Sequence, residues 1–272
     1  MEVVFHAGST LLEGPIWDAD NNLLYCVSIE QGIIYKVNPN TGKVDSFTTN
    51  GSVGCVALTT SQNLISAEKE GLYHIDVNTK IKKHITQLNP NVDLRYNDGR
   101  FDPVGRFLVG TKSEKDYFVE EKIPTGKLYS YYNGKSKVLL NDLLISNGIG
   151  FSSNGTKMYF IDTPTKKVAQ YTYDLETGDI SFDKHIVEID GNGWPDGMCV
   201  DIDGNIWVAE WEGGRVRKWD INTGQAINEI ELPCPRVTSC CLGGKNLDEL
   251  FITTAKSKNN LLGGGLFKHK IR

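Results

Sequence analysis

The sequence predicts an all-β protein built as a six-bladed β-propeller, with residues 1–272 forming a single domain. Three observations predict this fold class. A strand opening recurs along the chain at propeller-like intervals, a hairpin-forming turn recurs within the repeats, and almost no stretch shows the period of an amphipathic helix. A chain of 272 residues is long for an average domain but common for a single all-β domain.

The recurring strand openings are short apolar segments that follow turn residues. Their anchors are separated by 41, 43, 51, 48 and 44 residues, and the anchors are Leu23, Leu64, Phe107, Met158, Ile206 and Leu250. An interval of about 40 to 50 residues, with about four strands in each unit, is the period of propeller blades. Six anchors therefore predict six blades.

A second recurring phrase places an Asp or Asn a few residues before Thr-Gly. It occurs at Asn38 to Gly42, Asp174 to Gly178 and Asp220 to Gly224. The acidic or amide side chain opens the turn as a hydrogen-bond acceptor, and glycine tolerates the positive φ that such hairpins need. The phrase predicts a hairpin between two strands of each of these blades.

The unit from residue 194 to residue 220 is the clearest blade. It is predicted to start with a tight Pro195-Asp196-Gly197 turn, followed by strands over 198–200, 205–210 and 215–220. We expect the ring to close by pairing residues 3–6 with the last hairpin, 265–271, because an unpaired strand edge is a liability. The longest interval contains a charged segment, 113–125, that could fold over one end of the central channel as a lid.

The composition argues against several classes of partner. The net charge of -5 gives no basic footprint for nucleic acid or for an anionic membrane surface. No apolar run approaches the length of a membrane span, and the first residues lack the pattern of a signal peptide. We therefore expect a cytoplasmic protein with no nucleic-acid or membrane partner, and the sequence identifies no protein partner.

The cysteines predict buried thiols and a reducing compartment. No CxxC pair is present, and three of the cysteines fall within apolar strand patterns. Adjacent Cys240 and Cys241 could bind a metal or form a vicinal disulfide. The favoured interpretation is that they are strand residues pointing to opposite faces. The six cysteines are Cys26, Cys55, Cys199, Cys234, Cys240 and Cys241.

A short polar motif is predicted just before the innermost strand of several blades. In each motif an acidic or amide side chain precedes glycine, and the motifs span residues 12–15, 95–99, 146–148 and 195–197. Because blades are arranged radially, equivalent positions converge on the axis. Glu13, Asn147 and Asp196 are therefore expected to meet in the central channel.

Two carboxylates and one amide oxygen would form a hard-oxygen site suited to Ca²⁺, Mg²⁺ or Mn²⁺. The alternative is that the motifs are only turns, and their recurrence at one position of the repeat favours the metal site in the central channel. The histidines show no HExxH or HxH spacing, which disfavours a zinc-histidine site. No GxSxG, GxGxxG or P-loop motif is present.

The sequence resembles the senescence marker protein/gluconolactonase/luciferin-regenerating enzyme family along essentially the whole chain. The motifs that carry the resemblance span residues 13–17, 95–106, 110–111, 145–148, 159–163, 195–198, 213–216 and 238–244. The resemblance implies a six-bladed propeller and a lactonase that depends on a divalent metal.

The resemblance also implies roles for individual residues. Glu13, Asn147 and Asp196 look like the metal ligands, with Asp196 also the general base. Arg95 and Asn97 look like the residues that hold the substrate hydroxyls, and Asn97 would also reach the metal through water. One divalent ion is implied, Ca²⁺, Mg²⁺, Mn²⁺ or Zn²⁺, and an all-oxygen ligand set favours Ca²⁺.

The chain departs from the family in the predicted lid. Animal members have Met-Ala-Glu-Glu after the Gly-Thr pair, whereas this chain has Lys112-Ser113-Glu114-Lys115. Lys115 aligns with a glutamate that contacts substrate in those proteins, so Glu114 is the expected substitute. Lys112 and Lys115 would favour a substrate with an anionic group.

The predicted function is metal-dependent hydrolysis of a small-molecule sugar lactone to its aldonic acid. One alternative is a regulatory calcium-binding protein without turnover, which would share the metal site. Another is a propeller that serves as a protein scaffold, although a scaffold has no need of convergent carboxylates. A third, hydrolysis of aryl esters or organophosphates, would use the same site as a side activity.

Overall fold

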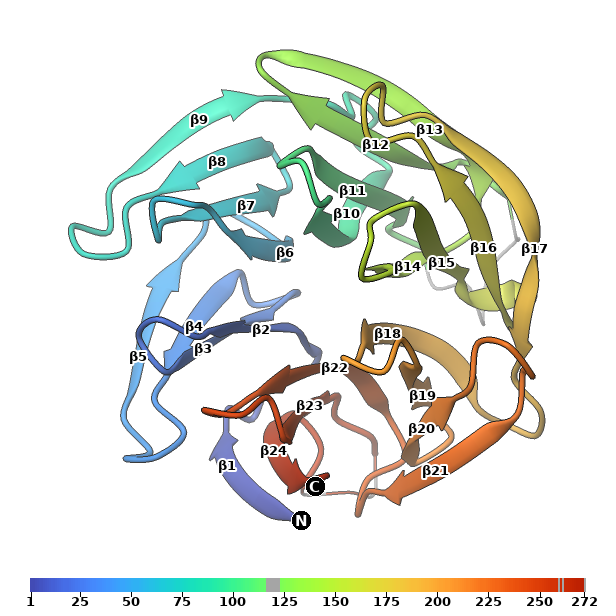
Figure 1. Ribbon diagram of the computed structural model, residues 1–272. Coiled ribbons are helices and arrows are strands. Elements are labelled where there is room, and N and C mark those ends of the chain that lie inside the picture. The colour runs from blue at the N-terminus through green and yellow to red at the C-terminus, as the bar shows by residue number, and fades with distance from the viewer. Residues whose placement is uncertain (116–122, 259, 261, 272) are drawn as a thin grey trace.

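A computed structural model describes residues 1–115, 123–258, 260 and 262–271. In this part of the chain, 24 strands form six four-stranded antiparallel sheets arranged around a central axis (Figure 1). The predicted six-bladed β-propeller is confirmed. The described helical structure is one 3-10 turn, η1 (Thr163–Thr165), and no described helix is long and apolar enough to cross a membrane.

Each blade runs from an innermost strand at the channel to an outermost strand at the rim. Blade 1 consists of β2 (Leu12–Asp18), β3 (Leu23–Ser28), β4 (Ile33–Val37) and β5 (Val44–Thr48). Blade 2 consists of β6 (Val53–Leu58), β7 (Leu64–Glu68), β8 (Gly71–Ile75) and β9 (Lys82–Thr86). Blade 3 consists of β10 (Leu94–Phe101), β11 (Phe107–Ser113), β12 (Gly126–Tyr132) and β13 (Lys135–Leu143).

The second half of the ring repeats this order. Blade 4 consists of β14 (Ser146–Phe151), β15 (Lys157–Asp162), β16 (Lys167–Tyr173) and β17 (Ile180–Glu188). Blade 5 consists of β18 (Trp194–Val200), β19 (Ile206–Trp211), β20 (Arg215–Trp219) and β21 (Ala226–Glu231). Blade 6 consists of β22 (Val237–Gly243), β23 (Glu249–Thr254), β24 (Gly265–Lys270) and β1 (Glu2–His6). All six anchors of the predicted repeat lie in the second strands of the blades.

The ring closes in blade 6, where the first strand of the chain supplies the outermost strand. β1 pairs antiparallel with β24, with Glu2 opposite Lys268 and His6 opposite Gly265. The two termini consequently lie beside each other (Figure 1). The predicted pairing of the N-terminal strand with the last hairpin is confirmed.

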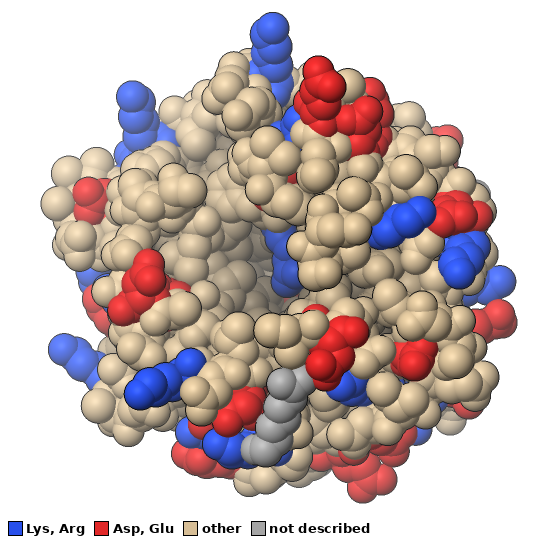
Figure 2. Space-filling model, viewed as in Figure 1, with Lys and Arg blue, Asp and Glu red and all other residues tan. Residues whose placement is uncertain are grey.

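Apolar side chains between neighbouring blades form the core. One cluster packs Trp207 and Val216 of blade 5 against Leu250 and Phe267 of blade 6, and all four side chains are at most 1% exposed. Burying large apolar side chains of this kind contributes about 1.5–3 kcal/mol each. Because every blade packs on two neighbours, the ring encloses a central channel, which opens as a hollow in the middle of the face shown in Figure 2.

The predicted hairpins join the third and fourth strands. In blade 5, the Asp220 carboxylate accepts hydrogen bonds from the backbone N–H groups of Asn222 and Thr223, at 2.8 and 3.0 Å. Gly224 follows with φ of 68°. In blade 2 the same position is Lys80, which is held at φ of 61° without the freedom of glycine.

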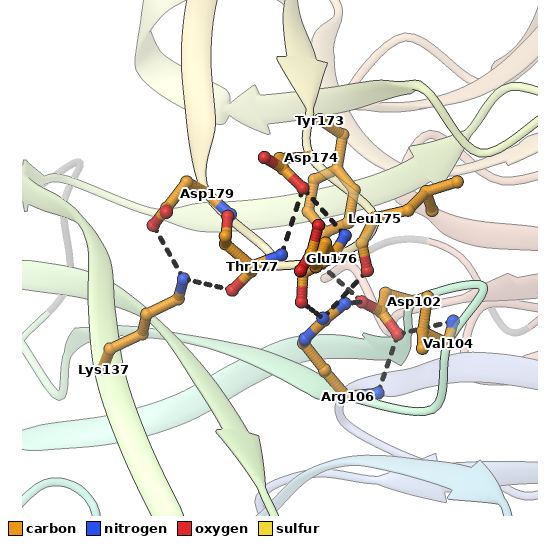
Figure 3. A network of polar contacts seen from close by, with 10 residues as sticks. All are labelled: Asp102, Val104, Arg106, Lys137, Tyr173, Asp174, Leu175, Glu176, Thr177 and Asp179. Carbon is orange, nitrogen blue, oxygen red and sulfur yellow. Dashed lines mark hydrogen bonds and ion pairs between the residues drawn. The ribbon is translucent and has the colours of Figure 1, made fainter.

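A buried polar network joins blades 3 and 4 (Figure 3). Asp102 lies in the β10–β11 turn, and its Oδ2 accepts hydrogen bonds from Arg106 Nη1 at 2.8 Å and from Tyr173 Oη at 2.6 Å. Arg106 Nη2 donates to the carbonyl oxygen of Leu175 at 2.9 Å. The network ties the inner turn of one blade to the third strand and outer turn of the next.

The polar channel motifs correct one prediction. They are not turns before the innermost strands but lie within these strands, at register shifts between Glu13 and Ile16 in β2 and between Pro195 and Met198 in β18. β10 and β14 have equivalent shifts. A β-bulge inserts extra residues and re-aims the side chains beside it, so each motif turns its polar side chain toward the channel without ending the strand.

Close packing between innermost strands explains two of the glycines of these motifs. A Cβ atom on Gly197 would lie 2.0 Å from Ser239 Oγ, and one on Gly148 would lie 2.8 Å from Met198 Cγ. Neither of these glycines has a positive φ, whereas Gly14 has φ of 53° and its nearest atom would be 3.9 Å from an added Cβ. An acid or amide followed by glycine therefore marks crowded strands in β14 and β18 but a backbone conformation in β2, and sequence alone does not distinguish the two.

All six cysteines lie among the described residues, and all are buried and free of disulfides. Cys240 and Cys241 belong to two different apolar clusters, one toward blade 5 and one toward blade 1. This confirms that they are strand residues pointing to opposite faces. The Sγ atoms of Cys199 and Cys240 lie 3.8 Å apart.

Candidate active site in the central channel

A cavity of about 1040 Å³ opens at one end of the channel, and all six side chains that the sequence singled out line it. They come from three neighbouring blades and one across the channel: Glu13 from β2, Arg95 and Asn97 from β10, Glu114 just after β11, Asn147 from β14 and Asp196 from β18. Residues far apart in sequence thus meet because their bulged strands share one position in the repeat.

Two buried carboxyl groups lie within hydrogen-bonding reach of each other at the floor of the cavity. They belong to Glu13, 6% exposed, and Asp196, 7% exposed. Burial raises the pKa of Glu13 to about 8, and the charge of Asp98 adds to the rise. Burial and the charges of Glu13 and Asp98 raise the pKa of Asp196 well above its ordinary value.

A chain of hydrogen bonds fixes the amide side chains beside this pair. Arg95 Nη1 donates to Asn97 Oδ1 at 2.6 Å, and Asn97 Nδ2 donates to Asn147 Oδ1 at 2.7 Å. Asn147 Nδ2 donates to Thr163 Oγ1 at 2.8 Å, and Thr163 in turn donates to the carbonyl oxygen of Pro195 at 2.8 Å. The chain crosses from blade 3 to blade 5 and holds the amide oxygens in fixed directions.

Sequence reasoning missed Thr163 as a member of the site. It is 5% exposed, lines the cavity, and connects Asn147 to the strand that carries Asp196. Its motif, residues 159–163, contributed to the family resemblance but offered no chemistry of its own. Only the fold places this hydroxyl beside the channel, because the residue stands after β15 in η1.

Asp98 is a second residue that the sequence reasoning left without a role. It lines a smaller cavity of about 230 Å³ in the same channel, together with Gly14, Met198 and Ser239. Burial raises the pKa of the Asp98 carboxyl as well. The signal was present in Asn97-Asp98-Gly99, where two polar residues precede the glycine, but a single alternating strand would aim only one of them at the site.

The donor set fits a hard divalent cation. Within the described ranges, no three His, Cys, Asp or Glu side chains gather as a metal-binding group, so the candidate set depends on the amide oxygen of Asn147. Two buried carboxyl groups, those of Glu13 and Asp196, repel each other in the ionised state, and the charge of the partly buried Asp98 adds to the repulsion. A cation beside Glu13 and Asp196 would reduce this repulsion, and carboxylate and amide oxygens are ligands that Ca²⁺ and Mg²⁺ accept.

The predicted lid lies partly outside the described residues, at 116–122. Of its described part, Glu114 lines the cavity, as does the preceding Lys112 at the end of β11. Glu114 Oε1 lies 3.4 Å from Lys69 Nζ, and the Glu114 N–H donates to the carbonyl oxygen of Asp93 at 2.8 Å. Glu114 therefore lies at the cavity wall, and its contact with substrate remains a prediction.

Comparison with known proteins places the chain among related propellers. The family description "SMP-30/Gluconolactonase/LRE-like region" matches residues 11–256. An uncharacterized protein of Sulfolobus acidocaldarius is 36% identical over 275 residues, covering 98% of this chain and 94% of the relative. Regucalcin of Danio rerio is 32% identical over 257 residues, covering 94% of this chain and 86% of the relative.

Solved structures agree with the sequence relatives. A luciferin-regenerating enzyme superposes with a TM-score of 0.90 at 27% identity, covering 97% of this chain and 94% of that one. A calcium-binding protein, regucalcin, from Agrobacterium tumefaciens superposes with a TM-score of 0.91 at 25% identity, covering 99% and 93%. From the matched span and these relatives, the chain belongs to the SMP-30/gluconolactonase/LRE-like family.

Proposed function

We propose that this protein is a metal-dependent lactonase that hydrolyses a small sugar lactone to its aldonic acid. The observation that carries the proposal is the buried Glu13–Asp196 pair at the floor of a large cavity whose wall presents Arg95 and Asn97. The name of the family includes gluconolactonase. A binding protein needs the carboxylates, but it does not need polar groups arranged beside them to orient a second molecule.

Glu13, Asn147 and Asp196 are the residues that we assign to hold one divalent ion. Their oxygens suit Ca²⁺, Mg²⁺ or Mn²⁺, with Zn²⁺ a further candidate and Ca²⁺ favoured by the all-oxygen set. When bound, such an ion supplies Lewis acidity toward a carbonyl oxygen, worth several kcal/mol in the transition state. The hydrogen bond from Asn147 Nδ2 to Thr163 turns the Asn147 amide oxygen away from Thr163. This oxygen accepts one hydrogen bond, from Asn97 Nδ2, and its second lone pair would serve as the ligand.

Asp196 is the proposed general base. It accepts a proton from a water molecule as the water oxygen attacks the lactone carbonyl carbon. The ring C–O bond then breaks, and the ring oxygen takes a proton, so lactone and water become one hydroxy acid. Beside a bound cation Asp196 would be ionised and so able to accept this proton, and catalysis of this kind contributes about 10²–10⁴-fold.

Arg95 and Asn97 are proposed to hold the substrate hydroxyls. Arg95 is 8% exposed and lies with Asn97 on the cavity wall, with one guanidinium nitrogen already committed to Asn97 and to the backbone of Tyr96. Its remaining donors have a fixed fork geometry suited to adjacent hydroxyl oxygens. Glu114, which forms an ion pair with Lys69, would accept a hydrogen bond from a further substrate hydroxyl.

A second candidate function is calcium binding without turnover, in a cytoplasmic regulatory role. The observation that favours it is the similarity to relatives named regucalcin, one of them titled a calcium-binding protein. It uses the same three ligands and makes no use of Arg95. Hydrolysis of aryl esters or organophosphates is proposed as a side activity of the same site.

The deciding experiment is pH-stat hydrolysis of a lactone panel that includes glucono-δ-lactone. Protein treated with chelator is compared with protein reloaded with Ca²⁺, Mg²⁺, Mn²⁺ or Zn²⁺, and Asp196→Asn is the matched variant. We expect turnover that requires the metal and falls by at least about 10²-fold in Asp196→Asn. Full activity in chelator would refute the metal-dependent mechanism, and metal binding without any turnover would favour the second candidate.

A further inference from the structure

Two tryptophan side chains stand side by side on the wall of the same cavity. Trp194 begins β18 and Trp211 ends β19, and the two residues are directly paired across the strands. Side chains of such a pair project from the same face of the sheet. Both are only partly buried, and both line the cavity that contains Asp196, which follows Trp194 by two residues.

Each indole ring is held by a cation. The Nζ of Lys166 lies 4.6 Å from the ring centroid of Trp194, and it donates a hydrogen bond to the carbonyl oxygen of Gly191 at 2.7 Å. The guanidinium of Arg236 lies 4.9 Å from the ring centroid of Trp211, and its Nε pairs with Glu212 at 2.7 Å. Cation–π contacts of this kind fix the orientation of each ring.

The backbone under the two rings is equally restricted. A Cβ atom on Gly193 would lie 2.5 Å from Glu210 Oε2, and one on Gly213 would lie 2.7 Å from Glu210 Cβ. Glu210 is 0% exposed and is paired with both Arg215 and Arg217. The strand ends that carry the tryptophans therefore rest on an immobile ion-paired side chain, which is the support that a preorganised binding wall requires.

The walls of the cavity differ in chemistry. Blade 3 presents Arg95 and Asn97, which are hydrogen-bonding groups, whereas blade 5 presents two indole rings beside the carboxyl groups of Asp196 and Glu212. A ligand that satisfies both has hydroxyl groups along one edge and an apolar face. A sugar ring has this form, because its hydroxyls project at the edge and its C–H groups lie on the faces. An extended open-chain ester has no such face.

We propose that Trp194 and Trp211 form a stacking wall that binds the C–H face of a cyclic sugar lactone and so selects ring substrates over open-chain esters. This inference rests on the proposed lactonase function and names the residues that determine its substrate class. Aromatic rings contribute large contact areas at low conformational cost. The wall acts by binding and positioning, and it takes no part in proton transfer.

Binding is tested first without turnover, using the metal-loaded protein and gluconolactam, the ring analogue in which a nitrogen replaces the ester oxygen. By calorimetry, Trp211→Ala and Trp194→Ala should each weaken lactam binding about tenfold, while Trp211→Phe retains most of the affinity. Trp17→Phe is the matched control, because Trp17 stacks on Phe251 and lines the smaller cavity instead. Unchanged lactam affinity in both alanine variants would overturn the proposal.

Kinetics separates stacking from a structural role. For glucono-δ-lactone, Trp211→Ala should raise KM about tenfold and change kcat by less than about threefold, since the wall binds ground state and transition state alike. For the open-chain methyl ester of gluconic acid, KM should not change. Equal increases for both substrates, or an increase confined to an aryl ester such as phenyl acetate, would refute selection of a sugar ring.

The two proposals fail in distinguishable ways. Wild-type protein that binds gluconolactam through the tryptophans but hydrolyses no lactone would refute the lactonase and leave the stacking wall intact. Wild-type protein that is an active lactonase, with Trp194→Ala and Trp211→Ala indistinguishable from it, would refute the stacking wall alone. Melting curves of each variant, with Trp211→Phe as the conservative rescue, exclude a loss of fold as the cause.

Discussion

Glu13 of blade 1 and Asp196 of blade 5 bring their carboxyl groups within hydrogen-bonding reach across the channel, although 182 residues separate them in the chain. Burial raises the pKa of both groups, that of Glu13 to about 8. Without a cation, the pair therefore holds at least one proton at neutral pH. A cation must displace that proton to bind.

Metal binding should consequently be linked to proton release. Below a pH of about 8, Glu13 is protonated in the metal-free protein, so affinity for Ca²⁺ should fall as the pH is lowered, by up to about tenfold per pH unit for each displaced proton. Calorimetry at pH 6, 7 and 8 in two buffers of different ionisation enthalpy measures both quantities. Glu114→Gln, at the wall of the same cavity, should leave the proton count unchanged.

One result would contradict this link between metal binding and proton release. Ca²⁺ affinity that is constant from pH 6 to pH 8, with the same heat in both buffers, would mean that no proton leaves on binding. The Glu13–Asp196 pair would then hold no proton at neutral pH.

Glu13→Gln should stabilise the metal-free protein at high pH. Glu13 has an ordinary pKa of 4.5 and a folded-state pKa of about 8. Below about pH 4.5 Glu13 is protonated in both the folded and the unfolded protein, so its ionisation does not change the free energy of unfolding. The folded protein loses stability as the pH rises between these values, and the loss is complete above pH 8. Glutamine does not ionise, so the variant should exceed wild type by about 4 kcal/mol in the free energy of unfolding at pH 8.

Urea unfolding in chelator at pH 4.5 and pH 8 measures this difference, which should vanish at the lower pH. With saturating Ca²⁺ the order should reverse, because only the wild-type site gains the full binding free energy. A variant that is less stable than wild type in chelator at pH 8 would contradict the burial penalty.

The repeat made the fold predictable, whereas the site depended on details that a sequence does not display. Anchor spacing gave the blade number because every blade must place its second strand at the same distance from the axis. The hairpin predicted at Asp220 is confirmed. The similar Pro195-Asp196-Gly197 motif was predicted as a turn but lies in a strand, and its glycine is needed because Ser239 leaves no room for a Cβ atom. Local sequence cannot distinguish a glycine needed for φ from one needed for space.

The parts of the site that were missed depend on contacts between blades. Thr163 has a role only because Pro195 and Asn147 lie within its reach. Trp194 and Trp211 are 17 residues apart in sequence and become a wall only through strand pairing. Carboxylate and amide side chains indicate a candidate site by their residue type alone. Threonine and tryptophan do not, because they are common in the strands of any β-protein.

Lys80 offers a test of backbone strain in the blade 2 hairpin. It occupies at φ of 61° the position that is Gly224, at 68°, in blade 5. Its side chain also pairs with Asp45 at 2.8 Å and lies 5.2 Å from the Phe47 ring centroid. Lys80→Ala loses these contacts and keeps the strain, whereas Lys80→Gly loses the contacts and relieves it.

Lys80→Gly should therefore be more stable than Lys80→Ala by about 1 kcal/mol, the cost of a left-handed conformation for a residue with a Cβ atom. Chemical denaturation of the two variants measures the difference directly, because both lack the exposed ion pair. Gly42→Ala, at the same position of the blade 1 hairpin with φ of 68° and no atom within 4 Å of an added Cβ, is the matched control and should lose about the same amount. Equal stability of the two Lys80 variants would show that the turn relaxes without cost.

Removing the Asp102 carboxylate should be costly to the stability of the fold. Burial raises its pKa, but hydrogen bonds from Tyr173 and Arg106 outweigh burial, so the pKa lies below its ordinary value. Its charge therefore stabilises the fold above about pH 4, and this contribution is lost as the pH falls through the lowered value. Asp102→Asn leaves the buried Arg106 guanidinium without its counter-charge and should cost about 3 kcal/mol at pH 7.

Tyr173→Phe removes only the hydrogen bond to the carboxylate and should cost about 1.5–3 kcal/mol at pH 7. Tyr173 acts on the carboxylate of Asp102, so the two substitutions remove the same interaction. The double variant Asp102→Asn, Tyr173→Phe should therefore lose less stability than the sum of the two single losses. Urea midpoints at pH 7 and pH 3 measure all three variants, and the Asp102→Asn effect should shrink at pH 3. An effect of Asp102→Asn that does not change with pH would assign the stabilisation to packing, since only an ionised Asp102 pairs with the charge of Arg106.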